Sequence, residues 1–171
     1  NDFLRLYSIA PPEQMNSLWD VPNLLLQKFP APEFNVATKI SLIPGDGKEQ
    51  RKTGLIIMGR DYATVTLTEK EGTFYLQNTQ AIKADEGAKE EVLEEITLKS
   101  NTVYLKVAVS APDAMCQFSF SENGRNFKKF GTPFKARVGK WIGAKVGLFS
   151  ISTPEASRGG YADVEYFGIT K

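Results

Sequence analysis

Apolar and polar residues alternate along most of this chain, with a period of two. The clearest runs cover residues 34–42, 62–68, 102–110 and 116–121. Side chains on a β-strand point alternately to its two faces, so this alternation predicts strands with one buried and one solvated face. Sheets built from such strands are usually antiparallel. The continuous apolar run at residues 55–58 instead predicts a central strand that is covered on both faces.

Short turn sequences separate these runs at intervals of about ten residues. They are rich in Gly, Pro, Asn and Asp, and they occur at residues 44–47, 59–61, 71–72 and 121–124. Closely spaced strands joined by such turns indicate an all-β sandwich or barrel of about a dozen strands. No linker, repeat or low-complexity tract divides the chain, so residues 1–171 are predicted to form a single domain.

The segment around residues 85–95 fits two kinds of structure. It is rich in helix formers, and the apolar residues Ala88, Val92 and Ile96 are spaced by four, as on one face of a helix. The second half of the segment also fits the alternation of a strand, and a helix would stand alone in an all-β chain. We therefore prefer a strand or an irregular edge. A short turn of helix is also considered for residues 12–17.

The composition narrows the possible functions. The 171 residues include 21 basic and 20 acidic side chains, no histidine and a single cysteine. The lack of histidine excludes Ser-His-Asp and Cys-His catalysis. One cysteine excludes a disulfide framework and a zinc–thiolate site, and Cys116 is expected to be a buried, small hydrophobic side chain. A net charge of +1 gives no reason to expect nucleic acid or an anionic membrane as a partner, and no apolar run could span a bilayer.

Two carboxylates near the end of the chain are the best remaining source of catalysis. Asp163 and Glu165 would share one face of the strand at residues 161–167, and two acids can hydrolyse a glycosidic bond without histidine. This run resembles the end of the Glu-x-Asp-x-Glu strand of concanavalin-like endoglucanases. Tyr161 stands where that strand has its first glutamate, and a retaining mechanism needs both carboxylates. We therefore predict no catalytic residue in this chain.

Asp163 has an alternative role as a ligand of a structural calcium ion. Calcium prefers carboxylate and carbonyl oxygens, and jelly-roll sugar-binding domains often hold one such ion near their termini. Asp2, Asp20 or Asn23 could supply further ligands. The sequence shows no compact calcium-binding loop, so the expectation is either no cofactor or this one ion.

Three aromatic residues, Trp19, Tyr62 and Trp141, are singled out as sugar contacts. Aromatic rings can pack against the C–H face of a sugar, although most aromatic side chains in a β-sandwich belong to the core. Trp19 lies in a loop, and Trp141 lies in a turn between two glycines. Either tryptophan could be exposed. For Trp141 we prefer a place in the core.

A series of short motifs follows the order of a known module along nearly the whole chain. Lys28 and Asn123 depart from it, because the module usually has arginine and aspartate at these positions. The matching segments are residues 4–6, 22–28, 37–39, 52–56, 119–124, 139–149 and 159–167. Through these segments the chain resembles the concanavalin A-like C-terminal domain of family 43 glycoside hydrolases of the β-xylosidase type.

The resemblance implies an all-β fold, a two-sheet antiparallel β-sandwich of the concanavalin A-like jelly-roll type. It also implies a place behind a five-bladed propeller of the same chain, which contains the catalytic acids and against which the sandwich packs. In β-xylosidases of this type a sandwich loop lends an aromatic side chain to the rim of the active-site pocket. The loop after Ile43 and the region of Trp19 are the places to look for it.

These features predict a non-catalytic accessory module of a glycosidase that acts on plant glycans of the xylan or arabinan type. Its expected partners are the catalytic propeller domain and the glycan. The alternatives are an independent carbohydrate-binding module and, less favoured, a concanavalin-like glycosidase in its own right. The resemblance favours a periplasmic or extracellular location in a bacterium over the cytoplasm. The sequence leaves open the sugar, its linkage and the oligomeric state.

Overall fold

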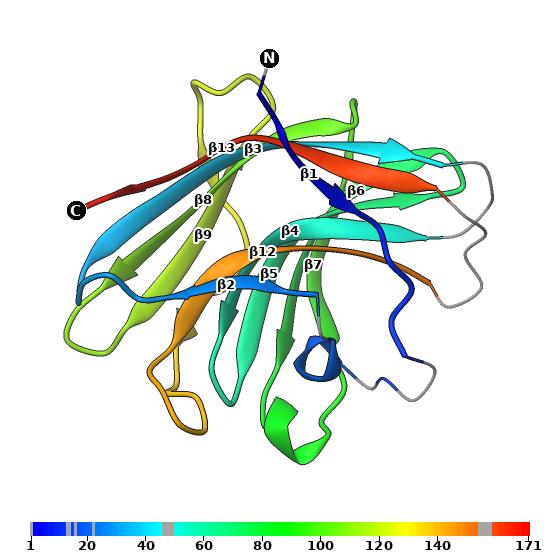
Figure 1. Cartoon of the computed structure of the whole chain (residues 1–171). Coiled ribbons are helices and arrows are strands. Elements are labelled where there is room, and N and C mark those ends of the chain that lie inside the picture. Colours follow the sequence, from blue (N-terminus) through cyan, green and yellow to red (C-terminus); the bar gives the residue numbers. More distant parts are fainter. Residues whose placement is uncertain (1, 13–14, 16, 22, 46–49, 154–158) are drawn as a thin grey trace.

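Two antiparallel sheets face each other in the computed structural model, which describes residues 2–12, 15, 17–21, 23–45, 50–153 and 159–171 (Figure 1). We call them sheet A and sheet B. Sheet A has the strand order β1-β13-β3-β8-β9-β10, and the short strand β11 also pairs with β9. Its strands are β1 (Leu4–Tyr7), β3 (Phe34–Pro44), β8 (Thr102–Ser110), β9 (Met115–Ser121), β10 (Lys128–Lys129), β11 (Phe134–Lys135) and β13 (Gly160–Thr170).

Sheet B has the strand order β2-β12-β4-β5-β6-β7. Its strands are β2 (Leu25–Lys28), β4 (Arg51–Met58), β5 (Tyr62–Lys70), β6 (Thr73–Ala81), β7 (Glu91–Leu98) and β12 (Lys145–Ser152). Two short 3-10 helices, η1 (Leu18–Asp20) and η2 (Ala84–Glu86), complete the regular structure of the described residues. Neither of them could cross a membrane, and the described part of the chain has no longer helix.

The core lies between the two sheets and is built by the alternation seen in the sequence. In β3 the buried residues Val36, Ile40 and Leu42 point inward, and the residues between them point outward. They meet inward residues of sheet B such as Leu55 and Val65. Because both sheets bury one apolar face against the other, the prediction of an all-β, two-sheet antiparallel sandwich is confirmed.

The segments for which the sequence was ambiguous are now assigned. The preferred strand near the end of residues 85–95 is confirmed as β7, and η2 accounts for the helical character before it. The described part of the helical turn considered for residues 12–17 is not helical; the helix is η1, which begins at Leu18. Residues 13, 14 and 16 of that stretch, and residues 46 and 47 of the turn at 44–47, lie outside the described residues.

Sheet B is covered on its outer face as well. Strand β4 is buried on both sides, as predicted for residues 55–58, because Leu55 and Ile57 face the core while Ile56 and Met58 face outward. The segment that carries η1 packs over this outer face, with Leu18 among the buried residues (Figure 1). The result is a second apolar cluster outside the sandwich: Leu18, Val21, Ile56, Met58, Tyr62, Ala81, Ala84, Phe149 and Ile151.

Candidate binding surfaces

Trp141 is the most exposed large hydrophobic side chain among the described residues, with 90% of its surface accessible. It lies in the loop between β11 and β12, where the Gly139 amide donates a hydrogen bond to the Ile142 carbonyl over 2.7 Å. The preferred prediction of a core position for Trp141 is therefore wrong. The two flanking glycines form a tight turn that points the indole outward and away from the sandwich.

The base of the Trp141 loop is fixed to sheet B through Asp61. This carboxylate is buried, and it accepts hydrogen bonds from the Arg137 guanidinium at 3.0 and 3.2 Å and from the Lys83 amide at 2.7 Å. The Arg60 amide also donates to the Val138 carbonyl. These bonds join three neighbouring connections at one end of the sandwich, so the loop presents Trp141 from a rigid base.

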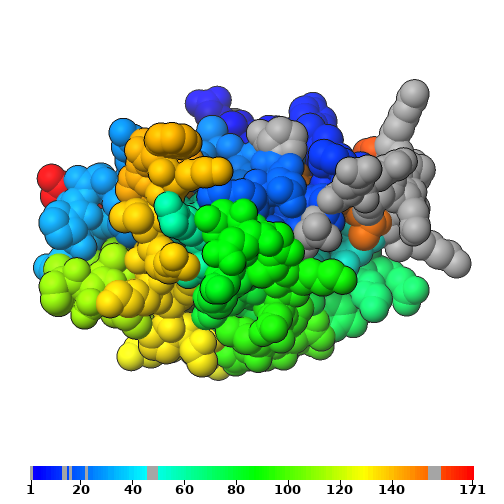
Figure 2. Space-filling view, turned by 90° about the horizontal axis from the view of Figure 1, so that it is seen from below, coloured from blue at the N-terminus to red at the C-terminus, as the bar shows by residue number. Residues whose placement is uncertain are grey.

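Other exposed apolar side chains lie in the connections at this end of the molecule. Val138 and Ile142 flank it in the same loop, and Ile82 lies in the connection after β6. All three are exposed, Val138 by 65%. Figure 2 shows the loop at residues 137–144 projecting beside the surface formed by residues 82–90. We call this set, Ile82, Val138, Trp141 and Ile142, the apolar rim.

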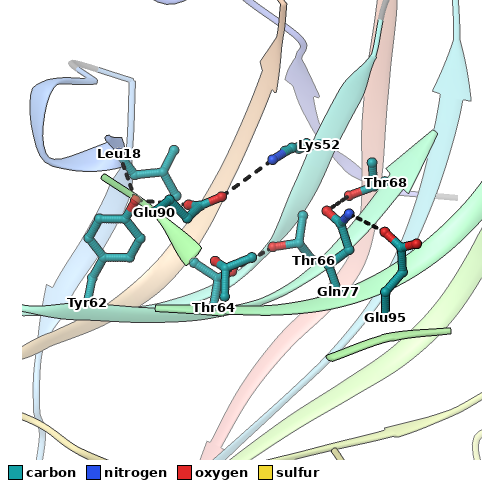
Figure 3. Close-up of polar contacts among 10 residues, drawn as sticks. Leu18, Lys52, Tyr62, Thr64, Thr66, Thr68, Gln77, Glu90 and Glu95 are labelled. Carbon is teal, nitrogen blue, oxygen red and sulfur yellow. Dashed lines mark hydrogen bonds and ion pairs between the residues drawn. The ribbon is translucent and has the colours of Figure 1, made fainter. Parts of the chain in front are cut away.

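The other two predicted sugar contacts lie on the outer face of sheet B. Tyr62 is fully buried, and its hydroxyl donates a hydrogen bond to Glu90 over 2.9 Å and accepts one from the Leu18 amide (Figure 3). Burial, followed by the nearby Glu90 charge, raises the pKa of Tyr62. Trp19, in η1, is partly buried against the second cluster. These contacts place the rings of Tyr62 and Trp19 in the second cluster rather than beside Trp141.

The two carboxylates of β13 face outward on sheet A, and each is paired with a cation. Both oxygens of Asp163 accept hydrogen bonds from the Arg5 guanidinium, at 2.8 and 2.9 Å. The Lys39 ammonium donates to Glu165. These pairs raise the pKa of Arg5 and of Lys39, in each case mainly through the hydrogen bond to the carboxylate. This arrangement joins neighbouring strands of sheet A.

The residues around Asp163 do not fit a calcium ion. Both of its oxygens already accept from Arg5, whose positive charge would repel a cation placed beside them. The described residues contain no group of three or more acidic or thiol side chains that could bind a metal.

Cys116 has the position expected from the sequence. It is fully buried in β9 within the core, and burial raises the pKa of its thiol to about 12. A thiol held neutral in this way is a poor nucleophile.

The sequence reasoning missed the apolar rim and the role of Asp61. One signal was available, because Val138 and Ile142 stand beside Trp141 in a glycine-rich turn, where a solvated loop would carry polar residues. Asp61 gave no such signal. Its partners Lys83 and Arg137 are 22 and 76 residues away in the chain, so only the fold brings them together.

The fold and these surfaces define a β-sandwich of the concanavalin A-like class. The sequence profile of the β-xylosidase C-terminal concanavalin A-like domain matches residues 1–170, nearly the whole chain. The chain therefore belongs to this family. A β-xylosidase of Formosa agariphila is 40% identical over 73 residues, which are 43% of this chain and 11% of that protein.

Solved structures share the same fold. The xylan β-1,4-xylosidase of Bacillus halodurans C-125 is 20% identical, with a TM-score of 0.75, over 99% of this chain and 33% of that one. A bifunctional GH43-CE protein of Bacteroides eggerthii is 23% identical, with a TM-score of 0.81, over 98% of this chain and 21% of that one. This chain thus corresponds to a C-terminal accessory domain, and it spans a third or less of the length of each of these three proteins.

Proposed function

We propose that this domain docks through its apolar rim on the catalytic domain of a family 43 glycoside hydrolase and places Trp141 at the mouth of that domain's sugar-binding pocket. The observation that carries the proposal is the 90% exposure of Trp141 on a loop with a fixed base. An exposed tryptophan with further exposed aliphatic side chains in the same and a neighbouring connection is typical of a surface that binds a partner.

The rigid base of the loop supports this role. A loop that is ordered before docking loses less conformational entropy when the partner binds. The bonds from Arg137 and Lys83 to Asp61 provide that order. Tryptophan also suits the mouth of a sugar pocket, because its ring offers a large apolar face and one N–H donor.

We infer the substrate class and the partner of the parent enzyme from the names of its relatives. Two of them are named as β-xylosidases, one specifically as a xylan β-1,4-xylosidase. We therefore assign the parent enzyme to glycans of the xylan or arabinan type. The catalytic acids would lie in the other part of that protein, expected to be a propeller. We also propose that residues 1–171 act as one domain, since both sheets contribute to a single core.

A second function, independent carbohydrate binding, is favoured by a separate observation. The outer face of sheet B contains a cavity with both apolar and charged side chains, far along β12 from the Trp141 loop. A self-sufficient glycosidase is disfavoured, because both acids of β13 are paired with cations.

Substitution of Trp141 tests the docking proposal. In the full-length parent enzyme, Trp141→Ala should lower kcat/KM on an aryl β-xyloside by about tenfold or more, the size of effect typical of an aromatic hot spot. Tyr7→Ala is the matched control, because Tyr7 is also an exposed aromatic but lies on β1 of sheet A. Equal activity of the two variants would contradict the role of Trp141.

A further inference from the structure

The outer face of sheet B contains a cavity of about 190 Å³ that no step of the docking proposal uses. It opens between the segment that carries η1 and the end of β12. Its walls combine two kinds of side chain. Leu18, Phe149 and Ile151 are apolar, whereas Lys52, Thr66 and Glu90 can form hydrogen bonds.

The polar side of the cavity is held in place by a short chain of contacts. The Lys52 ammonium lies 3.4 Å from one Glu90 oxygen, and the Tyr62 hydroxyl donates to the other at 2.9 Å (Figure 3). The Leu18 amide in turn donates to the Tyr62 hydroxyl over 3.1 Å. Tyr62 is therefore a positioning residue, because it fixes the Glu90 carboxylate and ties the apolar wall at Leu18 to the polar side.

The strands beneath the cavity are closely packed. Phe149 of β12 pairs with Gly54 of β4, and Gly54 pairs with Thr66 of β5, so two residues of the cavity wall flank Gly54. A Cβ atom added to Gly54 would lie 2.1 Å from the Val65 carbonyl oxygen, so the close approach of β4 and β5 requires glycine. The wall of the cavity therefore rests on a tightly fitted part of the sheet.

We propose that this cavity binds a single sugar ring of a neutral glycan, with its C–H face against the partly exposed Met15 and its hydroxyls on Lys52 and Glu90. The mixture of an apolar wall with a few fixed polar groups is the usual composition of a small-molecule site. Drug-sized ligands need roughly 300–1,000 Å³. A cavity of about 190 Å³ therefore has room for only a small ligand.

The charges of the cavity select a neutral ligand. Lys52 and Glu90 carry opposite charges and sit side by side, so neither an anion nor a cation gains a net attraction there. The pair does offer one donor group beside one acceptor group. Neighbouring sugar hydroxyls, each of which can donate and accept, match that arrangement.

The cavity is distinct from the apolar rim. Trp141 precedes the start of β12 at Lys145, whereas Phe149 and Ile151 lie near its other end. At about 3.3 Å per residue, the six steps from Lys145 to Ile151 span about 20 Å. The domain would therefore hold a glycan at a second point away from the catalytic pocket. We take this sugar to be a pentose such as xylose, which rests on the proposed function, but the existence of the site does not rest on it.

The test is a titration of this chain with methyl β-D-xyloside and, separately, methyl β-D-glucoside, followed by the methyl NMR signals of Leu18, Ile151 and Ile82. For one small ring we expect a dissociation constant of about 1 mM. The signals of Leu18 and Ile151 should shift with saturation, while Ile82 on the apolar rim should not. No saturable shift of Leu18 and Ile151 with either sugar would overturn the proposal. Binding of the glucoside alone would support the cavity and count against the pentose, and hence against the xylan assignment.

Matched lysine variants separate this site from general surface effects. Lys52→Met should weaken binding by about tenfold or more, because it removes a charged hydrogen-bond donor. Lys70→Met is the control, since Lys70 is exposed at the end of β5 on the same sheet. If Lys52→Met unfolds, Glu90→Gln tests the same point with nearly unchanged side-chain size. Equal affinities of folded Lys52→Met, or of Glu90→Gln, and Lys70→Met would reject the assigned polar contacts.

Discussion

The outer faces of the two sheets differ in what covers them. On sheet A the face is open to solvent, and ion pairs such as Arg5–Asp163 and Lys39–Glu165 lie across neighbouring strands. The Arg5 guanidinium also stacks over the Tyr161 ring at 3.8 Å. On sheet B, the segment that carries η1 covers part of the face and forms a second apolar cluster with it.

This difference explains why a cavity forms on sheet B. On the open face of sheet A, side chains are surrounded by water and by each other, so they do not have to fit against a second layer. A covering segment on sheet B makes the fit between two layers matter, and a cavity remains where the layers do not meet. This cavity opens between the segment that carries η1 and the end of β12.

Loss of Phe149 should give the largest effect in this comparison. Phe149 is almost completely buried in the second cluster, and removal of a buried aromatic ring leaves a large void. Phe149→Ala should lower the free energy of unfolding by about 4 kcal/mol, measured by urea denaturation. On sheet A, Tyr166→Ala removes a ring that is 42% exposed and should cost about 0.5 kcal/mol. Similar losses for the two variants would mean that the second cluster contributes little.

Glycine substitutions give the next largest contrast. Gly54→Ala should destabilise the protein by about 3 kcal/mol, because the added Cβ atom would collide with the Val65 carbonyl at 2.1 Å. Gly168, in β13 of sheet A, is the matched control, since its added Cβ would have no neighbour closer than 3.9 Å. Thermal unfolding should show Gly168→Ala unchanged or slightly more stable. If Gly54→Ala is as stable as Gly168→Ala, the close approach of β4 and β5 does not require glycine.

The sandwich was predictable because the alternation of buried and exposed residues is visible within each strand. The strands of sheet A, such as β3 and β8, alternate strictly, and each residue's side follows from its neighbours in the chain. Sheet B was harder, since β4 and β5 are buried on both faces and lose the alternation. The sequence marked the continuous run at residues 55–58 as covered, but it could not say that the segment at η1 provides the cover.

The sites were less predictable, because they depend on contacts between distant residues. Asp163 looked like a metal ligand until the fold placed Arg5, which is 158 residues away, on both of its oxygens. Tyr62 looked like an exposed sugar contact, yet η1 buries its ring and only its hydroxyl reaches the polar side of the cavity. Trp141 was named as a sugar contact but assigned to the core, whereas its side chain is exposed. In each case the sequence shows the type of side chain, but its exposure and its contacts depend on residues that are distant in the chain.

The smallest effect concerns the tyrosine hydroxyl on sheet B and depends on pH. Tyr62→Phe should cost about 1 kcal/mol at neutral pH, because Leu18 and Glu90 each lose a hydrogen-bond partner. Burial raises the pKa of Tyr62 above the value of about 10 in the unfolded chain. The unfolded state therefore ionises first, and the wild type loses stability as the pH rises above about 10. The Phe variant lacks this loss, so the difference in the free energy of unfolding between wild type and Tyr62→Phe should shrink from pH 8 to pH 11 in urea denaturation.

Tyr166→Phe on sheet A is the control, and the greater exposure of Tyr166 predicts a weaker trend. A constant difference between wild type and Tyr62→Phe across this range would show that the buried hydroxyl does not resist ionisation.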